Sequence, residues 1–422
     1  MVFFGVSAND AHEPESELAA ANQAIENLVK EAAANERRAN ALSENAWRWV
    51  FRYRRLQRAL RRVIGGPNNL PAGSTAQTNG NSAAARTEET LTKLLALAKS
   101  ELRHGRNHSA AAIAQLIADR FPENPRAQHL SASIPSVERN DTRPQRLKAN
   151  YHLALAQAHY FLGEIEAAVS NFQAALTFNP DLPEAHSGLA AIKMPGISYL
   201  DWLEKLYRFL NPQNVIEIGV SQSASLARVP APAIAIGVDP VPSVIYPLQT
   251  EAHIFAETSD NFFARRNVRE LLRSEPLSIG FIDGSHLFEQ ALRDFINLER
   301  YCGPTSVIMF HDTVPLDELT QRRTPETHFS TGDVWKTILC LKQHRPDLDI
   351  FTIATPPTGL TIVTGLDPRS TILSEIYDRA LADLLNLPFS AVENTLSSDL
   401  NLVPNDWNQV VTRLKSRGII EP

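Results

Sequence analysis

Cysteine is scarce in this chain of 422 residues, because only Cys302 and Cys340 occur and neither lies near another thiol. The sequence therefore indicates neither a disulfide framework nor a cysteine-rich zinc site, and it fits a reducing compartment. A run of about 18 apolar residues, which a membrane helix needs, is also lacking, as is a basic leader at the start. The net charge is −6, so bulk composition does not indicate a nucleic-acid partner. These absences predict a cytoplasmic protein with no transmembrane segment.

The first part of the chain carries a seven-residue repeat. Small or apolar residues recur at alternating steps of three and four from Leu18 to Val63, and Asn35 is the polar interruption. Such a seam needs a partner helix to cover it, so residues 13–64 are predicted to form a coiled coil that makes the protein a homo-oligomer. A long helix packed against its own chain is the alternative. Residues 65–87 are rich in Gly, Asn, Ser and Ala and predict a flexible linker.

An internal repeat runs through residues 88–193. A glycine, an alanine and a proline recur at one constant interval: Gly105, Ala110 and Pro122, then Gly163, Ala168 and Pro180. The second copy, YHLALAQAHYFLGEIEAAVSNFQAALTFNP, resembles a tetratricopeptide repeat. Stacks of such helix pairs often bind proteins, which implies a possible protein partner. The alternative is that so few repeats only support the next domain.

After Pro195 the pattern changes to short apolar runs separated by stretches long enough for a helix. These runs predict buried strands, the first five of them parallel and joined by helical crossovers. The last two runs are joined by a turn too short for a helix, so they predict a hairpin with an antiparallel final strand. We expect a doubly wound α/β sheet of seven strands within residues 195–366, followed by a helical extension over 367–422. The expected strands span 214–219, 233–238, 253–256, 277–282, 306–310, 350–354 and 360–364.

The segment VIEIGVSQSAS ends the first strand with an acidic residue, one further residue and a glycine. Together with the strand order, it resembles the first motif of class I S-adenosylmethionine-dependent methyltransferases. The resemblance implies S-adenosylmethionine as the cofactor, bound around a tight turn at Glu217, Gly219, Ser221 and Ser223. The second glycine of that motif is missing near Ser223.

Two further aspartates match cofactor positions of the same family. Asp239 directly follows the second strand, where these enzymes bind the ribose hydroxyls. The same spacing would serve NAD, but the chain has no G-x-G-x-x-G and ends its sheet in a hairpin. Asp260, after the third strand, matches the position that contacts adenine, and capping of a helix is its alternative role.

The segment FIDGSHLFEQALRDFINLERYCGPTSVIMFHDTVP places ionisable residues at two strand ends. Asp283 ends the fourth strand, His286 follows it, and His311 and Asp312 end the fifth. The carboxyl ends of neighbouring parallel strands meet at one edge of a sheet, so these side chains should converge on one cleft. Structural alternatives are a turn-forming Asp283, a buried His311 bonded to a backbone carbonyl and an exposed His286.

This segment resembles a methyltransferase family that includes metal-dependent O-methyltransferases of sugars and small hydroxylated compounds. The resemblance implies that Asp283, which also borders the cofactor, and Asp312 bind Mg²⁺ or another divalent cation. His311 would be a further ligand or would support one, and His286 would be the general base. Softer metals such as Mn²⁺ or Fe²⁺ are compatible with the same residues.

The resulting hypothesis is an O-methyltransferase that acts on a hydroxylated small molecule or a saccharide. Two alternatives stay open: a non-catalytic scaffold with a degenerate methyltransferase-like domain, and an iron-dependent hydroxylase on the same fold. A polar insert follows the fifth strand, and its basic residues either contact an anionic substrate or form a solvated surface. They are Arg322, Arg323, His328 and Lys336.

Overall fold

The computed structural model describes residues 80–134 and 145–419. The chain divides into two units, Met1–Gln77 and Thr78–Pro422, and the described residues all belong to the second. The predicted coiled coil over residues 13–64 and most of the predicted linker lie outside the described residues, so both stay predictions. Within the described ranges, no helix is both long enough and apolar enough to cross a membrane.

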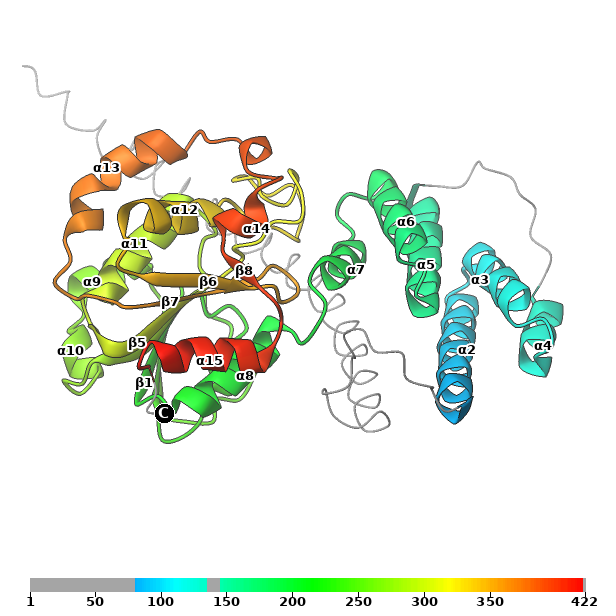
Figure 1. Cartoon of the computed structure of the whole chain (residues 1–422), viewed down its shortest axis with the longest axis horizontal. Coiled ribbons are helices and arrows are strands. Elements are labelled where there is room, and N and C mark those ends of the chain that lie inside the picture. Colours follow the sequence, from blue (N-terminus) through cyan, green and yellow to red (C-terminus); the bar gives the residue numbers. More distant parts are fainter. Residues whose placement is uncertain (1–79, 135–144, 420–422) are drawn as a thin grey trace, which may run out of the picture. The chain divides into compact units, whose positions relative to one another are not determined.

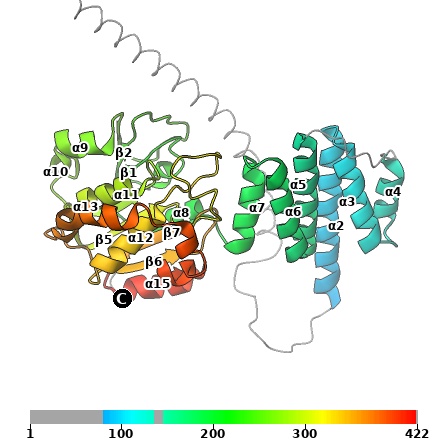
Figure 2. The same cartoon turned by 90° about the horizontal axis from the view of Figure 1, so that it is seen from above.

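Helices fill the segment in which the sequence repeats. Helices α2 (Gly80–Arg103) and α3 (Asn107–Arg120) form one antiparallel pair, and α5 (Gln145–Leu162) and α6 (Ile165–Phe178) form another (Figures 1 and 2). Gly105 and Gly163 turn the chain within each pair at φ +70° and +77°, a conformation that glycine adopts without a steric cost. The sequence repeat therefore corresponds to two helix pairs, while a tetratricopeptide array and its protein partner stay predictions.

Two shorter helices complete this part, α4 (Pro125–Ser133) and α7 (Pro183–Lys193). Both have proline in the first turn, where the missing N–H costs no hydrogen bond. Helix α2 already begins at Gly80, inside the segment 65–87 that was predicted as linker. The three consecutive alanines at 83–85 favour a helix there despite the neighbouring Asn and Ser.

All seven predicted strands are present, and they belong to one mixed sheet with the order β3-β2-β1-β4-β5-β7-β6-β8. Strand β7 is antiparallel to both of its neighbours, as the hairpin predicts. The strands are β1 (Asn214–Ile218), β2 (Ile234–Val238), β3 (Ala252–Phe255), β4 (Leu277–Ile282), β5 (Cys302–His311), β6 (Asp349–Ile353) and β7 (Leu360–Thr364).

The sheet has eight strands, so the predicted number of seven was wrong. Strand β8 (Leu402–Val403) pairs in parallel with β6 and lies within the extension that was predicted to be helical. Its pairing satisfies backbone groups of β6 that would otherwise form an open sheet edge. Helices α13 (Ile372–Leu384), α14 (Leu396–Asp399) and α15 (Trp407–Ser416) make up the rest of this extension, with a 3₁₀ turn at Phe389–Ala391.

The first two crossovers differ from the prediction of helical connections. A 3₁₀ turn at Leu226–Arg228 is the only helical element between β1 and β2, and residues 239–251, between β2 and β3, form an irregular loop. Proline explains both, because Pro230 and Pro232 follow the 3₁₀ turn and three more prolines, at 240, 242 and 247, occupy the loop. Both connections around β2 are therefore made of loop rather than of α-helix.

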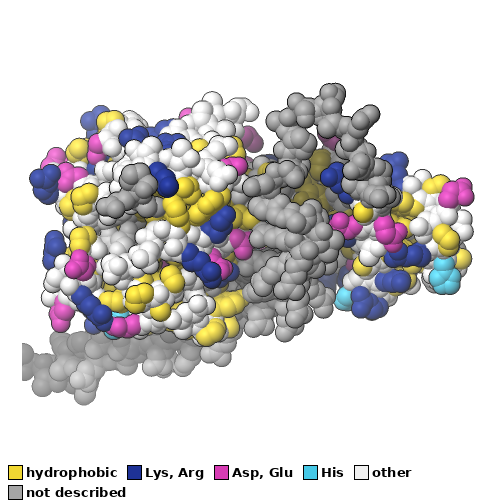
Figure 3. Space-filling view, turned by 60° about the horizontal axis from the view of Figure 1, so that its bottom comes forward, with side chains coloured by type: hydrophobic (Ala, Val, Ile, Leu, Met, Phe, Trp, Pro, Cys, Tyr) yellow, Lys and Arg dark blue, Asp and Glu magenta, His cyan; other side chains and the backbone are white. Residues whose placement is uncertain are grey.

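Later crossovers are helical as expected: α9 (Ser259–Arg265) and α10 (Val268–Leu271), then α11 (Phe288–Glu299), then α12 (Trp335–His344). In Figure 1 helices α11, α12 and α13 cover one face of the sheet, and α8 (Tyr199–Leu210) and α15 lie on the other. Large buried side chains fill both interfaces, including Trp202 of α8 and Phe295 of α11. On the face drawn in Figure 3, acidic and basic side chains of the described residues are interspersed.

Helix α11 carries a carboxylate in this apolar layer. Asp294 is 1% exposed, and Gln290 Nε2 donates a hydrogen bond of 3.1 Å to its Oδ1. Burial raises the pKa of Asp294 to about 6, and hydrogen bonds from Ser259 and Gln290 oppose that shift. The folded protein therefore binds this proton more tightly than the unfolded chain does, so the free energy of unfolding falls as pH rises from about 4 to about 6.

Replacing the acid by its neutral amide, Asp294→Asn, should remove this pH-dependent loss. We expect the variant to gain stability over the wild type as pH rises from 4 to 7, by up to about 3 kcal/mol for a shift of about two pKa units. Urea unfolding of both proteins at several pH values measures the difference. A stability difference that does not change with pH would contradict the assignment.

Candidate functional site

The turn after β1 is tight because two strand ends touch. Gly219 has φ +89°, and a Cβ there would lie 2.0 Å from the carbonyl oxygen of Asp283 at the end of β4. Ser221 and Ser223 also have left-handed backbones, at φ +44° and +62°. The hydroxyl of Ser223 is buried and donates to the carbonyl of Tyr246 at 3.1 Å. A serine thus holds the conformation for which the motif uses glycine, and the turn is kept.

Asp239, at the end of β2, is hydrogen-bonded to this turn. Its Oδ2 accepts hydrogen bonds from the backbone N–H groups of Val220, at 2.9 Å, and Ser221, at 2.8 Å, and its Oδ1 accepts one from Val241 at 2.7 Å. The two oxygens of a carboxylate offer about four acceptor positions, so at least one is left for a ligand. Asp239 is therefore placed to shape the turn and to accept a hydroxyl hydrogen bond at the same time.

Glu217 and Asp260, both predicted to contact the cofactor, lie in different surroundings. Glu217 is fully buried, accepts a hydrogen bond of 2.6 Å from Ser225, and its Oε2 has no partner within the described residues. Burial raises the pKa of Glu217 well above the usual range. The hydrogen bond from Ser225 opposes this shift, and the charges of Asp283 and Asp239 add to it. Asp260 is exposed in the first turn of α9 and lies 3.3 Å from Arg293, while Thr258 caps that helix. The alternative role of Asp260 as the helix cap was therefore wrong.

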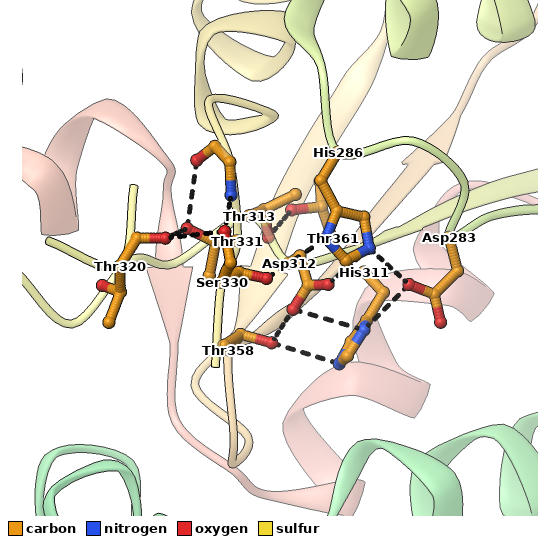
Figure 4. Close-up of polar contacts among 11 residues, drawn as sticks. Asp283, His286, His311, Asp312, Thr313, Thr320, Ser330, Thr331, Thr358 and Thr361 are labelled. Carbon is orange, nitrogen blue, oxygen red and sulfur yellow. Dashed lines mark hydrogen bonds and ion pairs between the residues drawn. The ribbon is translucent and has the colours of Figure 1, made fainter. Parts of the chain in front are cut away.

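Three predicted side chains meet between the ends of β4 and β5. His286 Nε2 lies 2.9 Å from Asp312 Oδ2 and 3.5 Å from Asp283 Oδ1. Figure 4 shows the His286 ring pointing toward both carboxylates. One ligand atom from each of Asp283, His286 and Asp312 lies within 4.8 Å of the others, a spacing that could hold a metal ion. The predicted convergence of the two strand ends is thus present.

His311 lies behind this group. Its Nδ1 is 3.1 Å from Asp283 Oδ1 and 3.4 Å from Asp312 Oδ1, and its Nε2 is 3.2 Å from the hydroxyl of Thr358. The ring is 7% exposed and stacks on Tyr199 with 3.7 Å between centroids. Thr358 also donates to Asp312 (Figure 4). His311 is therefore placed to orient the two carboxylates.

Charge dominates the electrostatics of this group. Burial alone would lower the pKa of His286, but Asp312 and Asp283 outweigh it and raise the pKa well above the usual value. The same balance raises the pKa of His311 to about 10. Asp312 shows the converse: burial opposes ionisation, but the two imidazoles hold its pKa well below the usual range. Two carboxylates and two protonated rings thus neutralise one another.

The donor set fits a hard divalent cation. Two carboxylates and one imidazole are ligands that Mg²⁺ or Mn²⁺ accepts, whereas a non-haem iron site typically uses two histidines and one carboxylate. The geometry brings His286 rather than His311 into the group of three, and the roles predicted for the two histidines stay predictions. The sequence could not show which histidine joins this group of three, because that depends on the left-handed backbone of His286 at φ +56°.

Sequence reasoning missed the side chains that support this group. Thr358 lies in the β6–β7 turn, whose sequence indicated only a hairpin, and Tyr199 lies far upstream at the start of α8. The basic residues of the insert are occupied within the chain: Arg323 pairs with Glu289 and Asp333, Lys336 with Asp333, His328 with Asp181, and Arg322 with Glu326. The described geometry therefore does not favour their contact with an anionic substrate.

Comparison with known proteins finds a domain match in this part of the chain. Residues 235–313 match a family described as a methyltransferase domain, and this span includes Asp283, His286, His311 and Asp312. The predicted methyltransferase is thereby confirmed at the level of the domain. No curated protein matches the chain.

Solved methyltransferases show a distant likeness. An O-methyltransferase from Bacillus cereus in complex with SAH is 14% identical, and the match covers 42% of this chain and 86% of that one with a TM-score of 0.30. For TomG, an O-methyltransferase from Streptomyces achromogenes in complex with SAM, the identity is 15%, the coverage 42% and 88%, and the TM-score 0.31. SAH-bound PaMTH1 from Podospora anserina is 12% identical, with coverage of 43% and 86% and a TM-score of 0.29. Likeness at this level identifies no acceptor.

The left-handed turn after β1 predicts an unusual response to substitution. Ser221 is exposed, so Ser221→Gly should relieve backbone strain and stabilise the protein by about 0.5–1 kcal/mol. Ser221→Val should destabilise it by about 1–3 kcal/mol, because a β-branched residue resists this backbone. Thermal unfolding of both variants checks the pair. Equal effects of glycine and valine would show that the turn is not left-handed.

Proposed function

We propose that this protein is an S-adenosylmethionine-dependent O-methyltransferase assisted by a divalent cation. The observation that carries the proposal is the approach of Asp283, His286 and Asp312 to within 4.8 Å, at the sheet edge that also holds Asp239 and the Gly219 turn. A methyltransferase-domain match over residues 235–313, which include Asp239 and these three side chains, supports the cofactor class. Open α/β sheets bind their ligands at this edge, between the carboxyl ends of the strands.

The residues at the two halves of the edge have separate tasks. Asp239 and the turn from Gly219 to Ser223 would hold the cofactor, which supplies a methyl group on a sulfonium. Asp283, His286 and Asp312 would hold the cation, which lowers the pKa of a hydroxyl and orients it. Methyl transfer requires little beyond this alignment and the removal of one proton.

The geometry changes the task of His286. The sequence predicted a general base, but Nε2 faces both carboxylates, at 2.9 and 3.5 Å, and its pKa is raised. Because an imidazole ligates a metal only in its neutral form, a cation held by Asp283 and Asp312 would displace the proton from Nε2. Since Nε2 is aimed at these two carboxylates, in this proposal His286 is a cation ligand. His311 stays a neighbour that orients Asp283 and Asp312 through hydrogen bonds.

The acceptor class follows from the chemistry of the cation. A hydroxyl oxygen is a hard donor that can share a hard cation with carboxylates, so a hydroxylated small molecule or a saccharide fits. A scaffold without turnover is less favoured because Ser221 and Ser223 keep the left-handed turn that the missing glycine put in doubt. An iron hydroxylase is less favoured by the ligand set of two carboxylates and one histidine.

Two separable binding sites give the sharpest test of this proposal. Asp312→Asn should weaken Mn²⁺ binding by at least about tenfold and leave S-adenosylhomocysteine binding intact, because only one half of the edge changes. Asp239→Asn should do the reverse. Calorimetry with each ligand measures both effects.

Asp349→Asn is the matched control, because it also removes a buried carboxylate, one that pairs with Arg413 away from this edge. It should leave both affinities unchanged. Failure of the wild-type chain to bind S-adenosylhomocysteine would overturn the proposed cofactor, and failure to bind Mn²⁺ would overturn the proposed cation.

Removal of the cation separates the proposed enzyme from the hydroxylase alternative. Dialysis against a chelator should abolish methyl transfer to a hydroxylated acceptor, and added Mg²⁺ or Mn²⁺ should restore it without oxygen. Methyl transfer is measured as S-adenosylhomocysteine formed from S-adenosylmethionine. Full turnover after chelation would show that the carboxylates serve without a metal, and a requirement for Fe²⁺ and oxygen would favour the hydroxylase.

A further inference from the structure

The end of the insert encloses His286. The Ser330 carbonyl lies 3.1 Å from His286 Nδ1, and because a carbonyl can only accept, Nδ1 donates and Nε2 is left to face the carboxylates. Two residues on, Gly332 has φ +53°, and a Cβ there would lie 1.8 Å from the carbonyl oxygen of His286. The backbone at Gly332 therefore lies closer to the His286 backbone than a residue with a side chain would allow.

Asp333 fixes the backbone on both sides of the histidine. Its own N–H donates to the His286 carbonyl at 3.1 Å, and its Oδ1 accepts from the N–H of Phe288 at 2.9 Å. Its Oδ2 accepts from Arg323 at 2.8 Å and lies 3.2 Å from the ammonium of Lys336. The Asp333 side chain is 1% exposed, so these contacts are made in the interior.

This arrangement addresses a local strain. His286 has φ +56°, a backbone that is strained for a residue other than glycine and persists only where its surroundings impose it. Residues 330–333 make the hydrogen bonds that hold this backbone. They bond to the carbonyl of His286, to its ring and to the N–H of Phe288. Without them, the ring would be free to leave the two carboxylates.

We propose that Ser330, Gly332 and Asp333 form a clamp that positions His286 for cation binding. Asp333 is a positioning residue in this clamp, since its carboxylate contacts backbone and basic side chains and acts through His286. The inference rests on the proposed cation site. In this proposal the insert determines whether His286, the third ligand of the cation, is held in place.

Gly332→Ala tests the clamp, because the added methyl group would displace the His286 backbone. We expect the affinity of the full chain for Mn²⁺ to fall about 10–100-fold, the range for groups that orient a metal ligand, while S-adenosylhomocysteine affinity stays unchanged. Electron paramagnetic resonance of Mn²⁺ measures the first affinity, and calorimetry measures the second.

Gly365→Ala is the matched control. Gly365, directly after β7, also has a positive φ, +80°, and its added Cβ would lie 3.1 Å from the carbonyl oxygen of Asp347. This variant should lose thermal stability but bind Mn²⁺ as the wild type does. A general effect of a strained alanine would weaken Mn²⁺ binding in both variants and would overturn the proposal.

Asp333→Asn is the second variant, in case Gly332→Ala does not fold. The amide oxygen can still accept from Phe288, but the charge that faces Arg323 and Lys336 is lost, so Mn²⁺ affinity should fall selectively. If the wild-type chain binds Mn²⁺ and folded Asp333→Asn binds it equally tightly, the clamp is overturned and the cation site is not. A wild-type chain that binds S-adenosylhomocysteine but no Mn²⁺ would overturn the cation site and the clamp together.

Discussion

Two carboxylates held at neighbouring strand ends are the constraint on which the rest of this site depends. The parallel pairing of β4 with β5 runs from Leu277 and Cys302 to Ile282 and Phe310, so Asp283 and Asp312 leave the sheet side by side. Like charges in a buried setting repel strongly and need compensation. In this structure the imidazoles of His286 and His311 supply it, and a divalent cation would supply it in the proposed enzyme. Hydrogen bonds from Thr358 and to Ser330 orient three of these four side chains, His311, Asp312 and His286.

Residues with a strained backbone lie at the same edge. Ser221, Ser223, His286 and Asp312 all have positive φ values, which are uncommon outside glycine. Each is held by specific partners, such as Asp239 for Ser221 and the segment 330–333 for His286. Strain of this kind persists where the surrounding structure imposes it, and it is typical of ligand-binding edges. The insert after β5 and the loop after β2 are therefore parts of the site's construction.

The sequence predicted the strands because buried parallel strands are continuous apolar runs bounded by turn residues. It also predicted that Asp283, His286 and Asp312 converge, since topology alone brings neighbouring strand ends together. It did not predict β8, whose two residues carry no pattern of their own, or the irregular connections around β2. It did not predict that His286 joins the two carboxylates, because the direction of its ring depends on its left-handed backbone and on Ser330, which lies 44 residues further along the chain.

An anomalous difference map from crystals of the full chain grown with Mn²⁺ and S-adenosylhomocysteine would test the central claim most directly. The account predicts one Mn²⁺ bound by Asp283, His286 Nε2 and Asp312, beside a cofactor whose ribose contacts Asp239. A crystal in which the cofactor is bound but the three side chains hold no metal, or in which the metal is bound elsewhere, would contradict it.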